Sequence, residues 1–373
     1  MKYYIIAGEV SGDKHAAFLM KQIKLQDSKA EFRCWGGDNM QNEGGYLVRH
    51  IKDLAYMGFI EVAIHLKTVL GNITLCKKDI LDYKPDAVIG VDYPGFNLRI
   101  EKFAKKNGFK VFHYISPQVW AWKKGRIKTM RKVLDKLYVI LPFEKPFYAK
   151  NNMDVEYYGS PLLDEISLFR SETENKDSFL KEHNLGNKPV IAILPGSRTQ
   201  EIQAMLPLQL KMFDKYKDRF DFVIAGVSTH SVEFYNKFIQ GRDIKLIFND
   251  TYKILNVASA GLITSGTATL ETALFNVPQV VCYKTSAISY AIIKLLANVT
   301  YASLVNLILN RCAVKELLQS KWNEKELDKE FSRICFNEDY IKQVKDDYAE
   351  LHRILGGSGA SEQIAKSLVQ KLK

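Results

Sequence analysis

Several short, almost entirely apolar runs in this sequence end abruptly in loops rich in glycine and polar residues. The clearest run, Val190–Leu194, is followed by residues 195–198 (PGSR) and then by a helix-like stretch. Continuous apolar runs of this length are typical of strands buried on both faces of a parallel sheet. A strand, a tight turn and a helix N-terminus in that order can bind an anion with backbone N–H groups. We therefore expect an α/β fold with a phosphorylated ligand near Arg198; an ordinary turn with a surface arginine is the alternative.

The same pattern recurs in two groups along the chain. The first group has apolar runs at 3–7, 32–35, 87–91, 111–115, 137–141 and 156–158, and the second at 190–194, 222–225, 244–247, 260–263 and 279–283. A polar stretch between them has the composition of a linker, and 373 residues are enough for two domains. We predict two Rossmann-like, doubly wound domains, 1–169 and 186–340, facing a central cleft, followed by a helical tail at 341–373.

A second loop in the latter half supports a nucleotide ligand. In residues 264–271 (TSGTATLE), small side chains leave a helix N-terminus unobstructed, so its N–H groups can hold a diphosphate with help from the helix dipole. Glu271 lies one turn into that helix, where a carboxylate can accept hydrogen bonds from two ribose hydroxyls. A glutamate chosen only to favour the helix is the alternative. The two loops together favour a nucleoside diphosphate.

The first half carries the best candidate for a catalytic base. The run 87–91 delivers Asp92 to the carboxyl end of a strand, where open α/β sheets bind ligands. In a Pro-Gly loop such a carboxylate can be partly desolvated, which raises its pKa and suits it to accept a proton from a hydroxyl. Capping of the next helix is the alternative, but Asn97 is better placed for that role. The acidic, hydroxyl-bearing turn at 8–13 is expected to lie nearby.

Composition limits the partners. A formal net charge of +11 and a pI near 9.1 favour an anionic partner, which could be nucleic acid, a phosphorylated substrate or an acidic membrane surface. The 5 cysteines are scattered and the histidines dispersed, which indicates a reducing cytoplasm without a disulfide framework or a metal site. The first apolar run is too short for a signal peptide, and no stretch is apolar enough to be expected to span a membrane.

Two segments are candidates for contact with lipid. Residues 54–75 are more apolar than one helix face needs, which indicates either a buried core helix, the reading that the residues alone favour, or a surface for acyl chains. Residues 123–136 interleave lysines and arginines with apolar residues, which suits an anionic lipid surface, although a solvated helix face has the same pattern. Trp120 and Trp122 could stack on a sugar or pack in a core.

Seven segments together resemble one family. They are AGEVSGD (7–13), DYPGFN (92–97), YISPQVWAWK (114–123), LPFE (141–144), LPGSR (194–198), SGTATLE (265–271) and VKELLQ (314–319). In this order the chain resembles the lipid-A-disaccharide synthases, which are inverting glycosyltransferases of the GT-B architecture, from the N-terminus to about residue 320. The tail at 341–373 is then expected to pack back on an N-terminal domain. Ser160 departs from the family pattern, which usually has histidine there, and Val305 stands where proline is common.

The resemblance implies a reaction and a location. It implies transfer of 2,3-diacylglucosamine from UDP-2,3-diacylglucosamine to 2,3-diacylglucosamine 1-phosphate (lipid X), giving a β-1,6-linked disaccharide phosphate and UDP. This step belongs to lipid A and lipopolysaccharide biosynthesis in a Gram-negative bacterium, in the cytoplasm at the anionic inner-membrane surface. No cofactor, metal or nucleic acid is expected, and a homodimer is compatible with it. On this resemblance, residues 54–75 and the basic segment are expected to face acyl chains and anionic lipid.

The resemblance also implies roles for individual residues. Asp92, Glu9 and Arg198 are the expected catalytic residues: Asp92 takes a proton from the acceptor's 6-hydroxyl, and Arg198 stabilises the departing UDP. The expected substrate-binding residues are Ser11, Asn97, Gln118, Ser265, Gly266, Thr267, Ala268, Glu271, Asn306 and Glu316.

Two other functions share part of this pattern. An enzyme like UDP-N-acetylglucosamine 2-epimerase would share both glycine loops, but it would need no apolar surface and no basic strip. A non-catalytic protein that senses nucleotide or anionic lipid would bind UDP and tolerate the loss of Asp92. Nucleic-acid binding would explain the positive charge but not the paired loops, and the sequence has no RNA- or DNA-binding motif.

Overall fold

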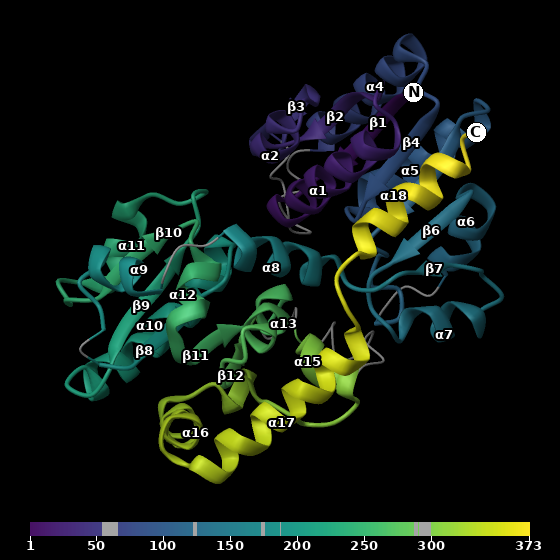
Figure 1. Cartoon of the computed structure of the whole chain (residues 1–373). Helices are drawn as coiled ribbons and strands as arrows, with labels where there is room; N and C mark the ends of the chain where they lie inside the picture. Colours follow the sequence, from purple (N-terminus) through teal and green to yellow (C-terminus); the bar gives the residue numbers. More distant parts are fainter. Residues whose placement is uncertain (54–65, 122–124, 173–175, 187, 287–289, 291–299) are drawn as a thin grey trace. The chain divides into compact units, whose positions relative to one another are not determined.

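A computed structural model describes residues 1–53, 66–121, 125–172, 176–186, 188–286, 290 and 300–373 of the chain (Figure 1). The chain forms two compact units. Unit 1 contains Met1–Glu165 and Gly357–Lys373, and unit 2 contains Ile166–Gly356. Each unit is described by itself below.

Unit 1 alternates strands and helices. Its strands are β1 (Lys2–Ala7), β2 (Glu31–Gly36), β3 (Tyr46–His50), β4 (Ala87–Val91), β5 (Lys110–Tyr114), β6 (Lys136–Val139) and β7 (Glu156–Tyr157). Its helices are α1 (Val10–Gln26), α2 (Asp38–Asn42), η1 (Ile51–Asp53), α4 (Leu66–Tyr83), α5 (Pro94–Lys106), α6 (Arg126–Val133), α7 (Glu144–Ala149) and α18 (Ala360–Gln370). Helix α8 (Pro161–Glu172) begins in unit 1 and ends in unit 2.

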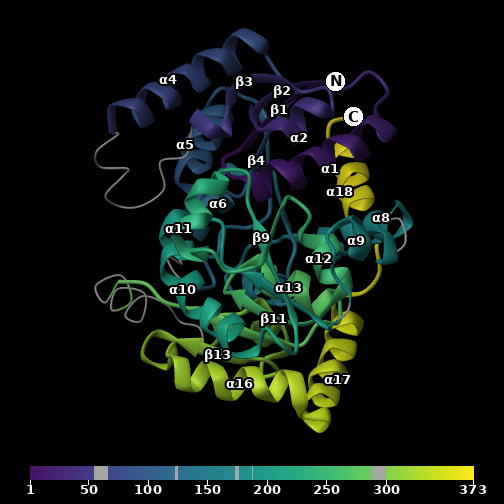
Figure 2. The same cartoon turned by 90° about the vertical axis from the view of Figure 1, so that its left-hand side faces the viewer.

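Unit 2 repeats this alternation. Its strands are β8 (Val190–Leu194), β9 (Asp221–Gly226), β10 (Lys245–Phe248), β11 (Ala258–Thr264), β12 (Gln279–Tyr283) and β13 (Lys315–Leu318). Its helices are α9 (Lys176–Glu182), α10 (Thr199–Tyr216), α11 (Val232–Ile239), α12 (Thr251–Val257), α13 (Thr267–Leu274), α15 (Leu304–Leu309), η2 (Gln319–Lys321), α16 (Glu324–Phe336) and α17 (Glu338–Leu355). Helix α17 directly follows α16 and leaves their junction at an angle to it (Figure 2).

Both sheets are parallel and doubly wound. The strand order is β3-β2-β1-β4-β5-β6-β7 in unit 1 and β10-β9-β8-β11-β12-β13 in unit 2. In each sheet the order reverses beside the first strand, between β1 and β4 and between β8 and β11. The loops that leave such a switch point diverge to opposite faces, which opens a crevice at the carboxyl ends of the strands. The predicted fold of two doubly wound α/β domains is confirmed.

The two faces of each sheet are covered by different helices. In β1, Tyr3 and Ile5 pack against α1 and α18, whereas Tyr4 and Ile6 pack against α4 and α5, because successive side chains of a strand point to opposite faces. In unit 2, α10, α11 and α16 cover one face of the sheet, and α9, α12 and α13 approach the other. Strands buried on both faces account for the continuous apolar runs in the sequence.

The end of the chain is divided between the units. Helix α17 packs on α15 and α13 in unit 2, whereas α18 packs on α1 in unit 1 (Figure 1). The sequence analysis treated 341–373 as one tail, but the division falls between Gly356 and Gly357. Gly356 has a φ of +84°, which favours glycine and ends α17 there. Among the described residues, no helix combines the length and the apolar character needed to cross a membrane.

Candidate functional site

Asp92 lies at the switch point of the sheet in unit 1. Strand β4 pairs with β1 up to Ala7 opposite Val91, so Asp92 follows directly at the carboxyl edge beside the turn that carries Glu9. The Asp92 N–H donates to the carbonyl of Tyr114 at 3.0 Å. The backbone there is strained, with φ values of +46° at Asp92 and +47° at the next residue. Such outliers cluster at functional sites.

The surroundings of Asp92 suit a general base. Burial, followed by the charge of Glu9, raises its pKa to about 6, although His113, the Tyr93 N–H and His15 act in the opposite direction. A carboxyl with this pKa is ionised at neutral pH and still basic enough to accept a proton from a hydroxyl. Glu9 itself is half-buried at the start of α1.

Asn97 is a structural support for this turn. It is fully buried, and its Nδ2 donates to the carbonyl oxygens of Asp92 at 2.7 Å, Ile6 at 3.2 Å and Val91 at 3.3 Å. The N-cap of α5 is Tyr93, so the prediction that Asn97 caps this helix is wrong. The sequence could not show that Pro94 is already inside the helix, which puts Asn97 in its first turn facing the sheet.

The other residues expected near Asp92 differ in exposure. Ser11 in α1 and Gln118, which follows β5, are both exposed at the carboxyl edge of the sheet. Trp120 packs edge-to-face on Phe143, with ring centroids 5.0 Å apart, and is 8% exposed, so it belongs to the core rather than to a sugar-stacking surface. Trp122 lies outside the described residues.

In unit 2, the chain itself supplies a carboxylate to the PGSR turn. The Oε2 atom of Glu201 accepts hydrogen bonds from the N–H groups of Ser197 at 3.1 Å and Arg198 at 3.3 Å, which forms a capping box at the start of α10. Gly196 has a φ of +106°, and a side chain there would collide with Glu201. These backbone donors were expected to bind a ligand anion, but Glu201 already satisfies them. The guanidinium of Arg198 is 57% exposed and lies 3.2 Å from Glu201 Oε1.

The second loop presents a more open helix N-terminus. Gly266 is the N-cap of α13, and Thr267 and Ala268 are its first two residues. The described part of the chain shows no protein acceptor for the N–H groups of these three residues. Gly266 has extended backbone with nothing near its Cα hydrogens. Ser265 braces the loop because its Oγ donates to the carbonyl of Ala302 at 2.9 Å. Donors at a helix N-terminus can bind an anion, so this loop is a candidate anion site.

The remaining predicted residues of unit 2 lie around this loop. Glu271 is half-buried and accepts a hydrogen bond from the hydroxyl of Tyr252 at 3.2 Å. Asn306 is fully buried: its Oδ1 accepts from the N–H groups of Ala313 and Val314, and its Nδ2 donates to Val314 and Glu316. All four hydrogen-bonding positions of that amide are therefore used within the protein.

Glu316 completes the same network. Its carboxylate accepts from the N–H groups of Ala302 and Ser303, both at 2.9 Å, and from Asn306 Nδ2 at 2.8 Å. Ala302 also holds Ser265 through its carbonyl. Asn306 and Glu316 thus hold the loop at 302–303 against the Ser265 loop.

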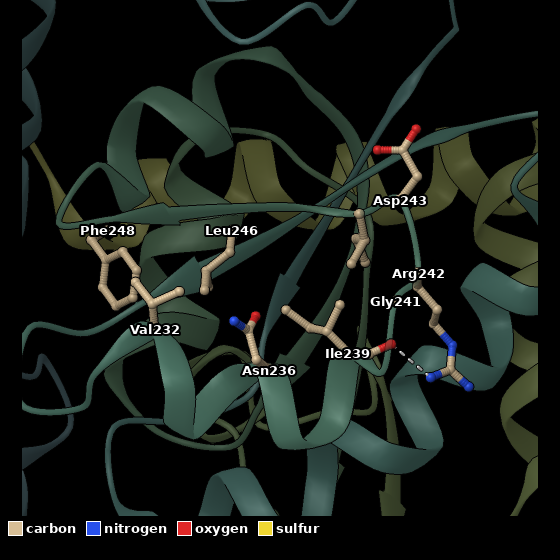
Figure 3. A pocket seen from close by; sticks show the side chains of 9 residues that line it. Val232, Asn236, Ile239, Gly241, Arg242, Asp243, Leu246 and Phe248 are labelled. Carbon is tan, nitrogen blue, oxygen red and sulfur yellow. Dashed lines mark hydrogen bonds between the residues drawn. The ribbon is translucent and has the colours of Figure 1, made fainter.

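An open pocket lies away from these loops. It has a volume of about 750 Å³ and lies between α11 and the edge strand β10 (Figure 3). Apolar side chains of Val232 and Ile239 from α11 face Leu246 and Phe248 from β10. Arg242 at its rim is paired with Asp214 and bonds the carbonyl of Ile239. None of the predicted site residues lines this pocket, so it is not the predicted site.

Several polar residues in the helices and strands beside these loops were not predicted from the sequence. They are Glu101, His113, His15 and Glu165 in unit 1, and Glu201 in unit 2. Glu201 carried a readable signal, since it stands three residues after Arg198 in a capping-box position. Within the described ranges, no group of three or more His, Cys, Asp or Glu side chains could hold a metal ion.

The two doubly wound α/β domains define the GT-B architecture. One switch point carries a carboxylate, and the other carries an open helix N-terminus. A sequence model described as Lipid-A-disaccharide synthetase matches residues 3–371. The lipid-A-disaccharide synthase of Syntrophus aciditrophicus (strain SB) is 37% identical over 376 residues, which cover 99% of this chain and 97% of the relative. The chain belongs to the lipid-A-disaccharide synthase family.

Solved structures show the same fold in other enzymes. The Methanocaldococcus jannaschii UDP-GlcNAc 2-epimerase in complex with UDP-GlcNAc and UDP gives a TM-score of 0.66 at 13% identity, covering 99% of this chain and 100% of the other. The calicheamicin glycosyltransferase CalG4 gives 0.61 at 12% identity, covering 100% and 98%. At these identities the likeness concerns the fold alone, so it gives no support to the epimerase alternative.

Proposed function

We propose that this enzyme transfers 2,3-diacylglucosamine from UDP-2,3-diacylglucosamine to the 6-hydroxyl of 2,3-diacylglucosamine 1-phosphate, with inversion and without a metal. Membership of the lipid-A-disaccharide synthase family supports the reaction. Unit 1 would supply the base, and unit 2 would supply the charge that stabilises the leaving group.

Each residue then has a chemical role. Asp92 takes the proton of the acceptor hydroxyl while that oxygen attacks the anomeric carbon of the donor sugar. The bond from that carbon to the UDP oxygen breaks, and UDP leaves with the electron pair. The N–H groups of Gly266, Thr267 and Ala268, together with Arg198, stabilise its diphosphate. Glu271 holds the ribose hydroxyls.

Ser11 and Gln118 are proposed to contact the acceptor, since both are exposed at the edge that carries Asp92. Asn97, Asn306 and Glu316 would act one step further away, because their polar groups hold the Asp92 turn and the loop at 302–303. Glu9 would tune Asp92 through its charge.

The observation that carries the catalytic assignment is the position of Asp92, half-buried at a switch point with a raised pKa. The test measures UDP release by purified enzyme given UDP-2,3-diacylglucosamine, with and without lipid X, for the wild type and Asp92→Asn. Release that depends on lipid X and that the variant lacks supports the assignment. Release without an acceptor would indicate hydrolysis, and UDP binding without turnover would indicate a sensor.

A peripheral membrane location is also proposed. Leu70, Leu75 and Leu81 of α4 are 50%, 37% and 42% exposed, and the same helix carries the exposed Lys67 and Lys78. An exposed mixture of leucine and lysine suits the interface of an anionic bilayer. Most of the segment 54–75 lies outside the described residues. Co-sedimentation with vesicles of phosphatidylglycerol should exceed that with phosphatidylcholine and should weaken in Leu70→Ser/Leu81→Ser; equal binding to both vesicles would contradict the proposal.

A further inference from the structure

Directly behind the Asp92 turn, two ionisable side chains meet where neither reaches solvent. The Nδ1 atom of His113 lies 2.5 Å from Oε1 of Glu101, and both side chains are 0% exposed. His113 belongs to β5 and Glu101 to the third turn of α5, so the pair joins the sheet to the helix that follows Asp92. The function described above uses neither residue.

The strand register explains how the sequence brings them together. His113 lies opposite Gly90 of the neighbouring strand β4, two residues before Asp92. Glu101 reaches His113 across Gly90: a Cβ on Gly90 would overlap Oε1 of Glu101 and lie 3.1 Å from Nδ1 of His113. The glycine inside this strand is therefore the space through which the carboxylate passes.

Stability does not account for such a pair. Removing two ionisable groups from water is expensive, and well-packed apolar side chains of similar volume often serve a core as well or better. Strands β4 and β5 are otherwise lined by Val88, Ile89, Val111 and Phe112, all fully buried. A histidine and a glutamate in this setting are expected to have another purpose, such as fixing one arrangement of the adjoining backbone.

The backbone next to the His113–Glu101 pair is the edge of the sheet that carries Asp92. Ile115, two residues after His113, has a φ of +66°, which is unusual for a β-branched residue, and its N–H donates to the carbonyl of Tyr138 at 3.1 Å. Asp92 and Tyr93 have φ values of +46° and +47° on the neighbouring strand end. Three residues in the left-handed region therefore lie at the adjacent ends of β4 and β5, directly after the His113–Glu101 pair.

The electrostatics agree with the geometry. Burial alone would lower the pKa of His113, but the charge and hydrogen bond of Glu101 raise it overall, with a smaller contribution from Asp92. The charged groups that act on Asp92 are Glu9 from the β1 turn, His15 from α1 and His113 from β5. His15 is itself paired with Glu165 of α8 at 2.6 Å.

We propose that Glu101 and His113 act together as a positioning pair for Asp92: Glu101 holds His113 as a cation, and His113 supplies positive charge behind the Asp92 carboxylate and supports the left-handed turn on which it stands. This inference rests on the proposed role of Asp92 as the base. Because coupling between two sites is reciprocal, Asp92 must influence the ionisation of His113 as much as His113 influences that of Asp92.

The first test is the pH profile of kcat/KM for His113→Gln and Glu101→Gln. Without the cation, Asp92 should hold its proton to higher pH, so the acidic limb of the profile should move up by about one unit. Activity should then be about fivefold lower at pH 6, about tenfold lower at pH 5 and little changed near pH 8. Tyr348→Phe is the matched control, since it removes a buried hydrogen bond to Gln279 of 3.0 Å in unit 2. It should lower the melting temperature and leave the limb in place. Equal loss of activity at every pH in the two pair variants would overturn the proposal.

The second test does not depend on turnover. Imidazole ¹⁵N NMR should show His113 titrating at higher pH in the wild type than in Glu101→Gln, because the carboxylate of Glu101 raises the pKa of His113. Asp92→Asn should shift the titration of His113 downward. A titration unchanged by Asp92→Asn would overturn the coupling even in an active enzyme. If the His113 titration depends on Asp92 but Asp92→Asn retains full turnover, the electrostatic link between the pair and Asp92 is supported and the role of Asp92 as the base is wrong.

Discussion

The Oδ2 atom of Asp164 accepts a hydrogen bond of 2.7 Å from the backbone N–H of Ser361, which lies 197 positions further along the chain. The other oxygen of the same carboxylate accepts from the N–H of Gly359. Asp164 stands in α8, just before the boundary between the units, and Gly359 and Ser361 start α18, just after the second boundary. The two places where the chain passes from one unit to the other are therefore tied by one buried side chain.

Asp164→Ala should loosen α18 from unit 1. The variant leaves two N–H groups at the start of α18 without their acceptor, and loss of such a cap costs about 1–2 kcal/mol. Hydrogen exchange over α18 and over the face of α1 that it covers should accelerate several-fold, while exchange in α16 should not change. Asp177→Ala in α9 is a control for the loss of a carboxylate in a first helical turn elsewhere. Unchanged exchange in α18 would show that packing alone holds the helix.

Gly266→Ala should weaken UDP binding without destabilising the fold. The backbone of Gly266 is extended, with φ 161° and ψ −161°, and no atom lies within 4 Å of the position of a Cβ. The new methyl group therefore fits, but it stands beside the N–H groups that we assign to the diphosphate. We expect the Kd for UDP to rise about tenfold, which corresponds to about 1.4 kcal/mol, with an unchanged melting temperature.

Gly71→Ala provides the matched control. Gly71 lies on the exposed side of α4, and a Cβ there also meets no atom within 4 Å. This change should leave UDP binding as in the wild type and stabilise the helix slightly. If Gly266→Ala binds UDP as tightly as Gly71→Ala, the diphosphate does not use this helix N-terminus.

Most strands could be predicted from the sequence because they are buried on both faces. A run such as Ala87–Val91 contains no polar residue and so lacks the pattern of an amphipathic helix. The glycine loops mark where each strand ends. Strands β3 and β13 were not predicted, since Tyr46–His50 and Lys315–Leu318 are only partly buried and carry charged residues. Edge strands are less buried and contain fewer apolar residues, so they are harder to recognise in the sequence.

The candidate site was readable only in part. Asp92 could be selected because a carboxylate directly after a buried strand has few structural uses. The sequence could not show that Glu201 folds back on the N–H groups of the PGSR turn, or that the amide of Asn306 is fully used inside the protein. His113 stands in an apolar strand, and its partner Glu101 is 12 positions away on a helix, so only the fold reveals the pair.

Glu144→Gln should change how stability depends on pH. Glu144 is buried, and its Oε2 accepts from the N–H groups of Ile140 at 3.1 Å and Leu141 at 2.9 Å. Burial raises its pKa to about 7 from 4.5 in spite of these bonds. As pH rises from 4.5 to 7, the unfolded chain loses this proton and the folded chain keeps it, so the wild type loses stability over that window.

The amide keeps an acceptor for both N–H groups and cannot ionise, so the variant should lack this loss. The free energy of unfolding of Glu144→Gln relative to wild type should therefore increase between pH 4.5 and pH 7.5, by roughly 3 kcal/mol at most. Urea denaturation of both proteins across this range measures the difference. Glu324→Gln, at an exposed position, controls for the loss of one surface carboxylate. A difference that stays constant with pH would show that Glu144 ionises in the folded protein as readily as in the unfolded chain.

The pH dependence of the reaction should reflect the ionisation of Asp92 and the charge of Glu9 beside it. With the pKa of Asp92 near 6, kcat/KM of the wild type should fall about tenfold per pH unit below pH 6. Asp92→Asn should lower turnover by about 10²–10⁴ and leave the Kd for UDP unchanged, because we assign the nucleotide to unit 2. Glu9 raises the pKa of Asp92 through its negative charge, so Glu9→Gln should move the acidic limb to lower pH, against the direction expected for His113→Gln. A limb that moves upward in Glu9→Gln, or that persists in the residual activity of Asp92→Asn, would show that another group titrates there.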